Sequence, residues 1–361
     1  PLMHLAVQRH FLDCLEGSPD VGGRFSALTP FAMAPGALLG MDLGAIAHSA
    51  LQMAEQCKAD EVSNNPGLAL GSWLAEQSLA GRDCLQLCID EQYRAFGSWI
   101  EQLIAESTGK EGRGILPLND ADASAPRSRL ARVILGASAN ETFWQRYPEA
   151  DDDGVPTQRI TLETEVDLGG EFFRWCFAIA VAGAVMQLNP FDEPDVAATK
   201  AVTRELLDGE SATSSGALLT PEAFGMSLAS SGQGSYLAIL TYLPDEPALF
   251  DVLEEFGKVV RQHFAIPVTL NPGPRYLHST GQLHKGGSPH GVFLFVRSVP
   301  EHDLDICDED FGFAHLNHAQ AEGDRTVLTD RGRSVCSIEL VGPTMSCVAQ
   351  LRGALAPILS V

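Results

Sequence analysis

The sequence is poor in basic residues. It contains 24 lysines and arginines against 47 aspartates and glutamates, which gives a formal net charge of −23. This excess of negative charge repels nucleic-acid phosphates and anionic lipids, so neither is expected as a main partner. An anionic substrate would have to meet a local group of basic side chains, which narrows where a binding site can lie.

Paired cysteine motifs are also missing. The eight cysteines are scattered through 361 residues and form no CxxC pair. Scattered thiols favour a reducing compartment, so we expect a cytoplasmic protein. A zinc site is the alternative interpretation, but no cluster of histidine and cysteine has the spacing of metal ligands. We therefore predict no metal site.

Long apolar runs and a leader are lacking as well. The sequence opens PLMH, without a basic and then apolar stretch, so no signal peptide is visible. The most apolar window, 172–188, contains Arg174 and is short for a membrane span. We predict that it forms a buried core helix.

Helix and strand patterns alternate along the chain, which predicts an α/β fold with a mainly parallel sheet. A small, polar stretch at 209–220 is typical of a linker. We therefore place one domain at 1–208 and a smaller α/β domain at 209–361. Strands are predicted at 83–89, 129–135, 159–162, 236–242, 292–296 and 336–340, and helices at 36–58, 66–79, 91–104, 170–188, 196–208, 248–263 and 346–359.

Residues 20–26 (DVGGRFS) form a candidate binding turn. Gly22 and Gly23 allow the backbone to approach a ligand closely, and Arg24 presents its forked guanidinium beside Ser26. The alternative is a turn with an ordinary surface arginine. A guanidinium in this position could hold negative charge that builds up on an oxygen atom.

Residues 106–110 (ESTGK) follow a predicted helix. A lone glutamate is usually a solvated surface residue. Here the small polar residues and glycine after Glu106 predict a tight turn at the border of a cleft. A carboxylate with a pKa near neutrality can move a proton, so Glu106 is our candidate general base. We predict that the four residues after Glu106 contact the substrate: Ser107, Thr108, Gly109 and Lys110.

Residues 189–194 (NPFDEP) mark a break after the buried helix, and the helix that follows contains Lys200. Glu193 is a candidate for substrate contact. The alternative interpretation of Lys200 is a cation on a helix surface.

A fourth segment, 273–287 (GPRYLHSTGQLHKGG), holds two histidines, two cations, a Ser-Thr pair and four glycines within fifteen residues. So polar a segment is not expected in a core, and it is typical of a functional loop. Its candidate site residues are Arg275, His278, Ser279, Thr280, Gln282, His284 and Lys285.

The first three segments together resemble the glucose-6-phosphate isomerase family. Residues 168–175 (LGGEFFRW), the fourth segment and 319–324 (AQAEGD) resemble the C-terminal part of bifunctional transaldolase–glucose-6-phosphate isomerase proteins. The resemblance runs from about residue 18 to about residue 341. It implies a three-layer αβα sandwich of the sugar-isomerase type, followed by a smaller α/β domain.

The resemblance also implies a reaction: glucose 6-phosphate and fructose 6-phosphate interconvert through an enediolate, without a metal or organic cofactor. Glu106 matches the family's base, and Arg24 matches the arginine that stabilises the enediolate. Lys200 matches the lysine that assists opening of the sugar ring. Family members commonly form dimers, so a homodimer is expected.

The sequence departs from the family pattern at three places. Glu193 stands where glutamine is usual, and Cys176 stands where we expect an acidic residue. The family's ring-opening histidine lies between the glutamate and lysine segments, but no histidine occurs there. His278 or His284 is our candidate to replace it.

A phosphate cradle is the element that we do not find. The family places it in a first sugar-isomerase domain, and only 23 residues precede Arg24. The nearest local candidate, 213–216 (TSSG), is interpreted as a loop. We therefore expect a C-terminal fragment of a larger, transaldolase-fused enzyme, with weak or no activity by itself. The rival interpretations are a non-catalytic sugar-phosphate sensor and a structural domain that supports assembly.

Overall fold

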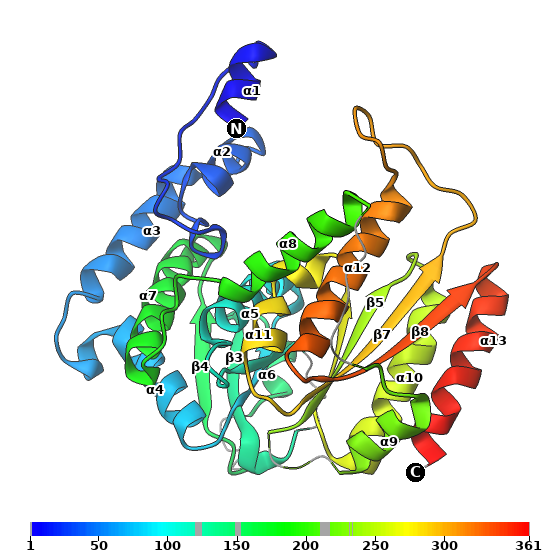
Figure 1. Ribbon diagram of the computed structural model, residues 1–361. Coiled ribbons are helices and arrows are strands. Elements are labelled where there is room, and N and C mark those ends of the chain that lie inside the picture. The colour runs from blue at the N-terminus through cyan, green and yellow to red at the C-terminus, as the bar shows by residue number, and fades with distance from the viewer. Residues whose placement is uncertain are drawn as a thin grey trace.

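The computed structural model describes residues 2–119, 125–148, 153–209, 217–230, 232 and 234–360. Two four-stranded sheets organise these residues, and every strand pair in them is parallel (Figure 1). The first sheet has the order β2-β1-β3-β4 and the second β6-β5-β7-β8. The predicted α/β class with a mainly parallel sheet is therefore confirmed. The strands are β1 (Cys84–Ile89), β2 (Leu116–Leu118), β3 (Leu130–Ala137), β4 (Thr157–Leu162), β5 (Tyr236–Tyr242), β6 (Val268–Pro272), β7 (Gly291–Val299) and β8 (Ser334–Val341).

Helices cover both faces of the second sheet. One face packs on α9, α10 and α13, and the other on α11 and α12. The first sheet packs one face on α4, α5 and α7, and α6 lies on the other. The helices are α1 (Leu2–Gln8), α2 (Pro30–Leu38), α3 (Leu43–Gln56), α4 (Pro66–Leu79), α5 (Arg94–Thr108), α6 (Glu141–Gln145), α7 (Leu168–Met186), α8 (Pro194–Leu207), α9 (Pro221–Ala229), α10 (Pro247–Phe264), α11 (Gly281–Gly286), α12 (Phe313–Asp330) and α13 (Thr344–Leu355).

Both strands that the sequence did not predict, β2 and β6, lie at sheet edges. Each is short and contains proline, Pro117 in β2 and Pro272 in β6. Proline cannot donate a ladder hydrogen bond, so within sheets it is found mainly on edge strands. It also interrupts the apolar pattern by which a strand is recognised. The predictions also lacked α1, α6, α9, α11 and α12.

The single helix predicted at 36–58 is wrong. The chain forms α2 and α3 instead, because Gly40 adopts a positive φ of 79° between them. Asp42 then starts the second helix, and its side chain accepts a hydrogen bond from the Ala45 amide at 3.0 Å. A carboxylate in this position satisfies one of the free amide groups of the first helical turn.

The apolar window forms α7, which packs against α3 and α4. The segment Glu165–Met186 is long and apolar enough to cross a membrane by length and composition. In the fold, α7 buries residues such as Trp175 and Ile179 in the core of the first half. Gly71 of α4 allows close packing, because a Cβ there would lie 2.3 Å from the carbonyl oxygen of Ala178. The predicted core helix is confirmed.

The two sheets lie on either side of the predicted domain boundary, β1–β4 before residue 209 and β5–β8 after it. Helix α8 reaches across and packs along α12 of the second half, as Figure 1 shows. The boundary itself stays a prediction. Of the predicted linker at 209–220, residues 210–216, which include the TSSG stretch, lie outside the described residues.

Candidate active site

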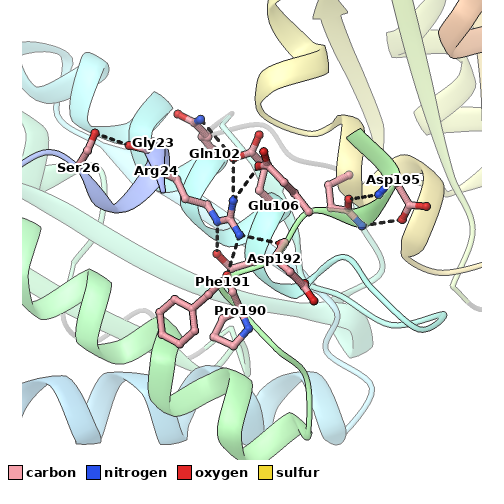
Figure 2. A network of polar contacts seen from close by, with 12 residues as sticks. Gly23, Arg24, Ser26, Gln102, Glu106, Pro190, Phe191, Asp192 and Asp195 are labelled. Atoms are coloured by element: carbon pink, nitrogen blue, oxygen red, sulfur yellow. Dashed lines mark hydrogen bonds and ion pairs between the residues drawn. The ribbon is translucent and has the colours of Figure 1, made fainter. Parts of the chain in front are cut away.

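Arg24 joins the three chemical segments into one cluster. It lies in a short turn of 3₁₀-helix (Gly23–Phe25), and only 3% of its surface is exposed. Its Nε donates to Ser107 Oγ at 2.9 Å, and Nη2 donates to the carbonyl oxygens of Pro190 and Asp192 at 2.8 and 2.9 Å. Nη1 donates to Glu193 Oε2 at 3.0 Å. Figure 2 shows this fan of contacts, which no other cation type could make with the same planar geometry.

Glu106 lies beside this guanidinium. Its Oε2 is 3.6 Å from Arg24 Nη1, and it accepts a hydrogen bond from Gln102 at 3.3 Å. Both Glu106 and Gln102 are on α5, one turn apart (Figure 2). Burial raises the pKa of the Glu106 carboxyl to about 7, because desolvation outweighs the opposing effect of Arg24. A carboxyl group with this pKa can both accept and release a proton near neutral pH.

Lys110 fixes the loop that contacts Arg24. Its ammonium donates to the carbonyl oxygens of Asn189 and Asp192 at 2.5 and 2.6 Å, and to Asp192 Oδ1 at 2.7 Å. An ammonium has three donors, and these three acceptors use all of them. The structure therefore gives Lys110 a positioning contact with the loop, and its predicted substrate contact would require one of these bonds to be exchanged.

The hydroxyl residues of the first two segments hold the local backbone. Ser26 Oγ donates to the Gly23 carbonyl at 2.6 Å, which closes the arginine turn. Thr108 Oγ1 donates to the Ile104 carbonyl at 2.8 Å and accepts from the Ile115 amide at 3.0 Å. The tight turn expected directly after Glu106 is wrong, because α5 continues to Thr108.

The glycines of these segments differ in their surroundings. A Cβ on Gly22 or Gly23 would meet no atom within 4 Å, so this side of the arginine turn is open. A Cβ on Gly109 would lie 2.3 Å from the Cα of Leu283. Gly109 therefore permits the two halves of the molecule to pack backbone to backbone.

The fourth segment lies between the halves. Every residue of α11 is buried, so the expectation that so polar a segment stays out of the core is wrong. Gln282 Nε2 donates to the Gly109 carbonyl at 3.0 Å and to Asp195 Oδ2 at 2.7 Å. Lys285 Nζ lies 2.5 Å from Asp324 Oδ1. The fold tolerates these two buried side chains because both Gln282 and Lys285 find partners.

His284 is part of this core. Its Nδ1 lies 3.1 Å from the Tyr236 hydroxyl, and its ring packs on Tyr236 and Phe293. Burial and the nearby Lys285 lower its pKa to about 3. His284 therefore stays neutral at physiological pH. None of its contacts within the described residues reaches Glu106 or Arg24.

Lys200 and His278 lie together in another place. Both are exposed, and both line a pocket of about 240 Å³ that also includes Arg204, Thr199 and Gln320. Among the described residues, Lys200 and Arg204 form no ion pair within 4.0 Å. No carboxylate among the described residues lines this pocket, so its lining is basic in a strongly acidic protein.

The remaining candidates of the fourth segment are dispersed. Arg275 is exposed and Ser279 is half-buried. Thr280 is buried and accepts a hydrogen bond from Asn271 Nδ2 at 3.3 Å. The structure thus brings Arg24, Glu106 and Glu193 together and leaves these residues elsewhere.

A cavity of about 570 Å³ opens beside the Arg24 cluster, and Lys110 and Asp192 line it. Its other cations already have protein partners: Arg331 pairs with Asp195, and Arg333 donates to the carbonyl oxygens of Lys285, Gly287 and Ser288. Asp192 and Gln102 were not predicted as site residues. The sequence could have indicated Gln102, because a residue four positions before Glu106 lies on the same face of a helix.

The chain is similar to glucose-6-phosphate isomerases over about half its length. No family model matches it. It is 26% identical over 239 residues to glucose-6-phosphate isomerase of Methanocaldococcus jannaschii, which covers 56% of this chain and 60% of that protein. It is 27% identical over 249 residues to a probable glucose-6-phosphate isomerase of Haloarcula marismortui, with 58% and 57% covered. The Streptococcus pyogenes glucose-6-phosphate isomerase is 29% identical over 234 residues, with 50% of each chain covered.

The chain therefore spans about half to three fifths of the length of the curated relatives it matches. Among solved structures, the C-terminal domain of glucosamine-fructose-6-phosphate aminotransferase from Francisella tularensis aligns with a TM-score of 0.26 and 10% identity, covering 88% of this chain and 91% of that one.

Proposed function

We propose that this chain carries the proton-transfer site of an aldose–ketose isomerase that interconverts glucose 6-phosphate and fructose 6-phosphate. The observation that carries the proposal is the pairing of Glu106, a buried carboxyl group with a pKa of about 7, with the guanidinium of Arg24. The similarity to proteins named glucose-6-phosphate isomerase supports it.

In the forward direction Glu106, ionised, takes the proton from C2 of the open-chain aldose, and the electrons move onto the carbonyl oxygen. The resulting enediolate carries a negative charge, which the buried guanidinium of Arg24 stabilises. The proton of the C2 hydroxyl passes to the C1 oxygen, Glu106 returns its proton to C1, and the C2 oxygen becomes the ketone carbonyl. The carboxyl group ends the cycle in its starting state, so no cofactor is required to balance it.

Glu193 controls access to Arg24. Its carboxylate is paired with Nη1 of Arg24 at 3.0 Å, and its side chain is 45% exposed. A substrate oxygen reaches that nitrogen when this partly solvated carboxylate moves away. A glutamine, the residue usual in the family, would compete less strongly for the cation.

The pocket that contains Lys200 and His278 suits an anionic group, because Lys200 and Arg204 form no ion pair among the described residues. The third cation of its lining, Lys285, is already paired with Asp324. Seven residues along α8 separate Glu193 from Lys200, about 10 Å at 1.5 Å per residue. We propose that the substrate lies along the start of α8. Lys200 assists ring opening, as the resemblance implies, and His278 takes the place of the family histidine that this sequence lacks. That the active protein is longer, and fused to a transaldolase, remains an expectation.

The rival is a sugar-phosphate sensor, which needs no base. The discriminating experiment is to incubate the protein with fructose 6-phosphate in D₂O and follow deuterium at C1 and C2 by NMR. An isomerase exchanges or transfers the proton, whereas a sensor binds the sugar without exchange. Binding without exchange, in this chain and in a longer form that contains it, would contradict the proposal.

A further inference from the structure

A second cavity lies between the edges of the two sheets. It has a volume of about 460 Å³ and is lined by the end of β2, by β6, by α5 and by α10. Glu101, which lines it, lies five residues before Glu106 on α5. Five residues correspond to about 140° around a helix axis, so the two glutamates face different directions. The cavity is therefore distinct from the Arg24 cluster.

Two buried polar groups on β6 line this cavity without a protein partner. Thr269 and Asn271 are two residues apart on the strand, so their side chains project from the same face. Asn271 is 7% exposed; its Nδ2 donates to Thr280, but its Oδ1 has no partner among the described residues. The hydroxyl oxygen of Thr269 is likewise unpartnered there.

Unpartnered buried polar atoms destabilise a fold, so each one needs an explanation. Strand β6 could have carried valine and leucine at these positions at no cost in β-propensity. A strand that holds two such groups, side by side and facing one cavity, is typical of a binding surface whose hydrogen bonds are completed by a ligand.

The other walls supply charges of both signs. Glu101 and Glu254 contribute two carboxylates, and Lys258 and Arg261 on α10 contribute two cations. Their formal charges sum to zero. Glu101 already accepts a hydrogen bond from Asn119, and burial raises its pKa. Lys258 and Arg261 form no ion pair within 4.0 Å among the described residues.

We propose that this cavity binds an uncharged polyhydroxylated molecule of the sugar or polyol class. A hydroxyl group both donates and accepts, so it can donate to Asn271 Oδ1 and Glu101 and accept from Lys258, Arg261 and Thr269. A phosphate is an anion, so the two carboxylates would repel it. The balance of charge therefore favours a neutral ligand, in contrast to the positive pocket around Lys200.

The test is calorimetric titration of the full chain with D-glucose, and with inorganic phosphate in parallel. We expect glucose to bind, and we expect Thr269→Val and Asn271→Leu each to weaken binding about tenfold, the effect of one lost hydrogen bond. Thr269→Val should leave the Tm unchanged or raise it, because it removes an unpartnered hydroxyl without changing the side-chain shape.

Thr241→Val is the matched control. Thr241 has a buried, unpartnered hydroxyl on the neighbouring strand β5 and does not line the cavity. This variant should resemble Thr269→Val in Tm and bind glucose like the wild type. Glu106→Gln should also bind glucose normally, so the result does not depend on the isomerase proposal.

Three results would overturn the proposal. The first is the absence of any heat of binding at glucose concentrations up to about 100 mM. A Kd of about 100 mM corresponds to a binding free energy of little more than 1 kcal/mol. The second is glucose binding that Thr269→Val and Asn271→Leu leave unchanged. The third is phosphate binding that Lys258→Ala abolishes while glucose fails to bind, which would make the cavity an anion site.

Discussion

The carboxylate of Glu106 lies 3.6 Å from the guanidinium of Arg24, and both side chains are almost completely buried. A distance of 3.6 Å is longer than a strong hydrogen bond, so Arg24 only partly offsets the desolvation of the acid. The pKa of Glu106 therefore stays raised, at about 7, although a cation is beside it. The same geometry that makes Glu106 basic enough to take a proton places Arg24 where the resulting charge needs stabilisation.

Glu106→Gln should abolish proton exchange with fructose 6-phosphate. A general base contributes about 10²- to 10⁴-fold to a rate, so we expect a loss of about that size. The measurement is deuterium incorporation by NMR together with a coupled isomerase assay. Glu171→Gln is the matched control. Glu171 is also buried, is paired with an arginine and has a raised pKa, but it lies on α7, outside the Arg24 cluster. Equal losses in both variants would show a structural effect rather than catalysis.

Glu193→Gln should increase activity and shift its pH dependence. Activity requires ionised Glu106, so kcat/KM should fall as the pH drops below about 7. The charge of Glu193 raises the pKa of Glu106, and its removal also frees Arg24. The acid limb of the pH–rate profile should therefore move to lower pH in the variant. An unchanged limb would contradict the electrostatic coupling between these residues.

The same carboxyl group should make stability depend on pH. Its folded pKa of about 7 exceeds the ordinary value of 4.5, so the folded state binds more protons between these limits. Stability from this group is complete below about pH 4.5 and is lost as the pH rises through 7, by about 3 kcal/mol. Urea titrations at several pH values should show this loss in the wild type and not in Glu106→Gln.

Arg24→Lys should disrupt both function and folding. An ammonium cannot reproduce the planar donors that contact Ser107, Glu193 and two carbonyl groups, so buried acceptors would lose their partners. We expect a loss of about 2–4 kcal/mol in the free energy of unfolding. Arg94→Lys is the control, since the Arg94 side chain is 80% exposed and pairs with an equally exposed Glu91. If Arg24→Lys and Arg94→Lys lowered the free energy of unfolding equally little, the contacts of Arg24 would not be needed for folding.

Gly109→Ala should weaken the joint between the halves. The added Cβ would lie 2.3 Å from a backbone atom of Leu283, which cannot move as a flexible side chain could. We expect a loss of about 1–3 kcal/mol, the usual range for overpacking. Gly22→Ala meets no atom within 4 Å and should be close to neutral in stability. Thermal denaturation of both variants checks the difference.

Sequence and structure agree best where the signal is local. The predicted strand at 236–242 has the same bounds as β5, because a continuous apolar run specifies a buried strand. The predicted helix at 66–79 has the same bounds as α4, because a capped, periodic segment specifies a helix. The prediction failed where partners lie far apart. Polar α11 is buried because Gln282 and Lys285 find Asp195 and Asp324, and no local pattern reveals such pairs.

The sequence by itself determined the α/β class, the positions of the central strands along the chain, and the three segments that supply Arg24, Glu106 and the loop before α8. Each of these is encoded in a short stretch of chain. Only the tertiary structure decided which of the candidates meet. It placed Arg24 and Glu106 together, put Lys200 and His278 in a pocket of their own, and enclosed His284 in the core. Burial and charge at each position depend on residues distant in the chain, and these set the pKa values on which the chemistry depends.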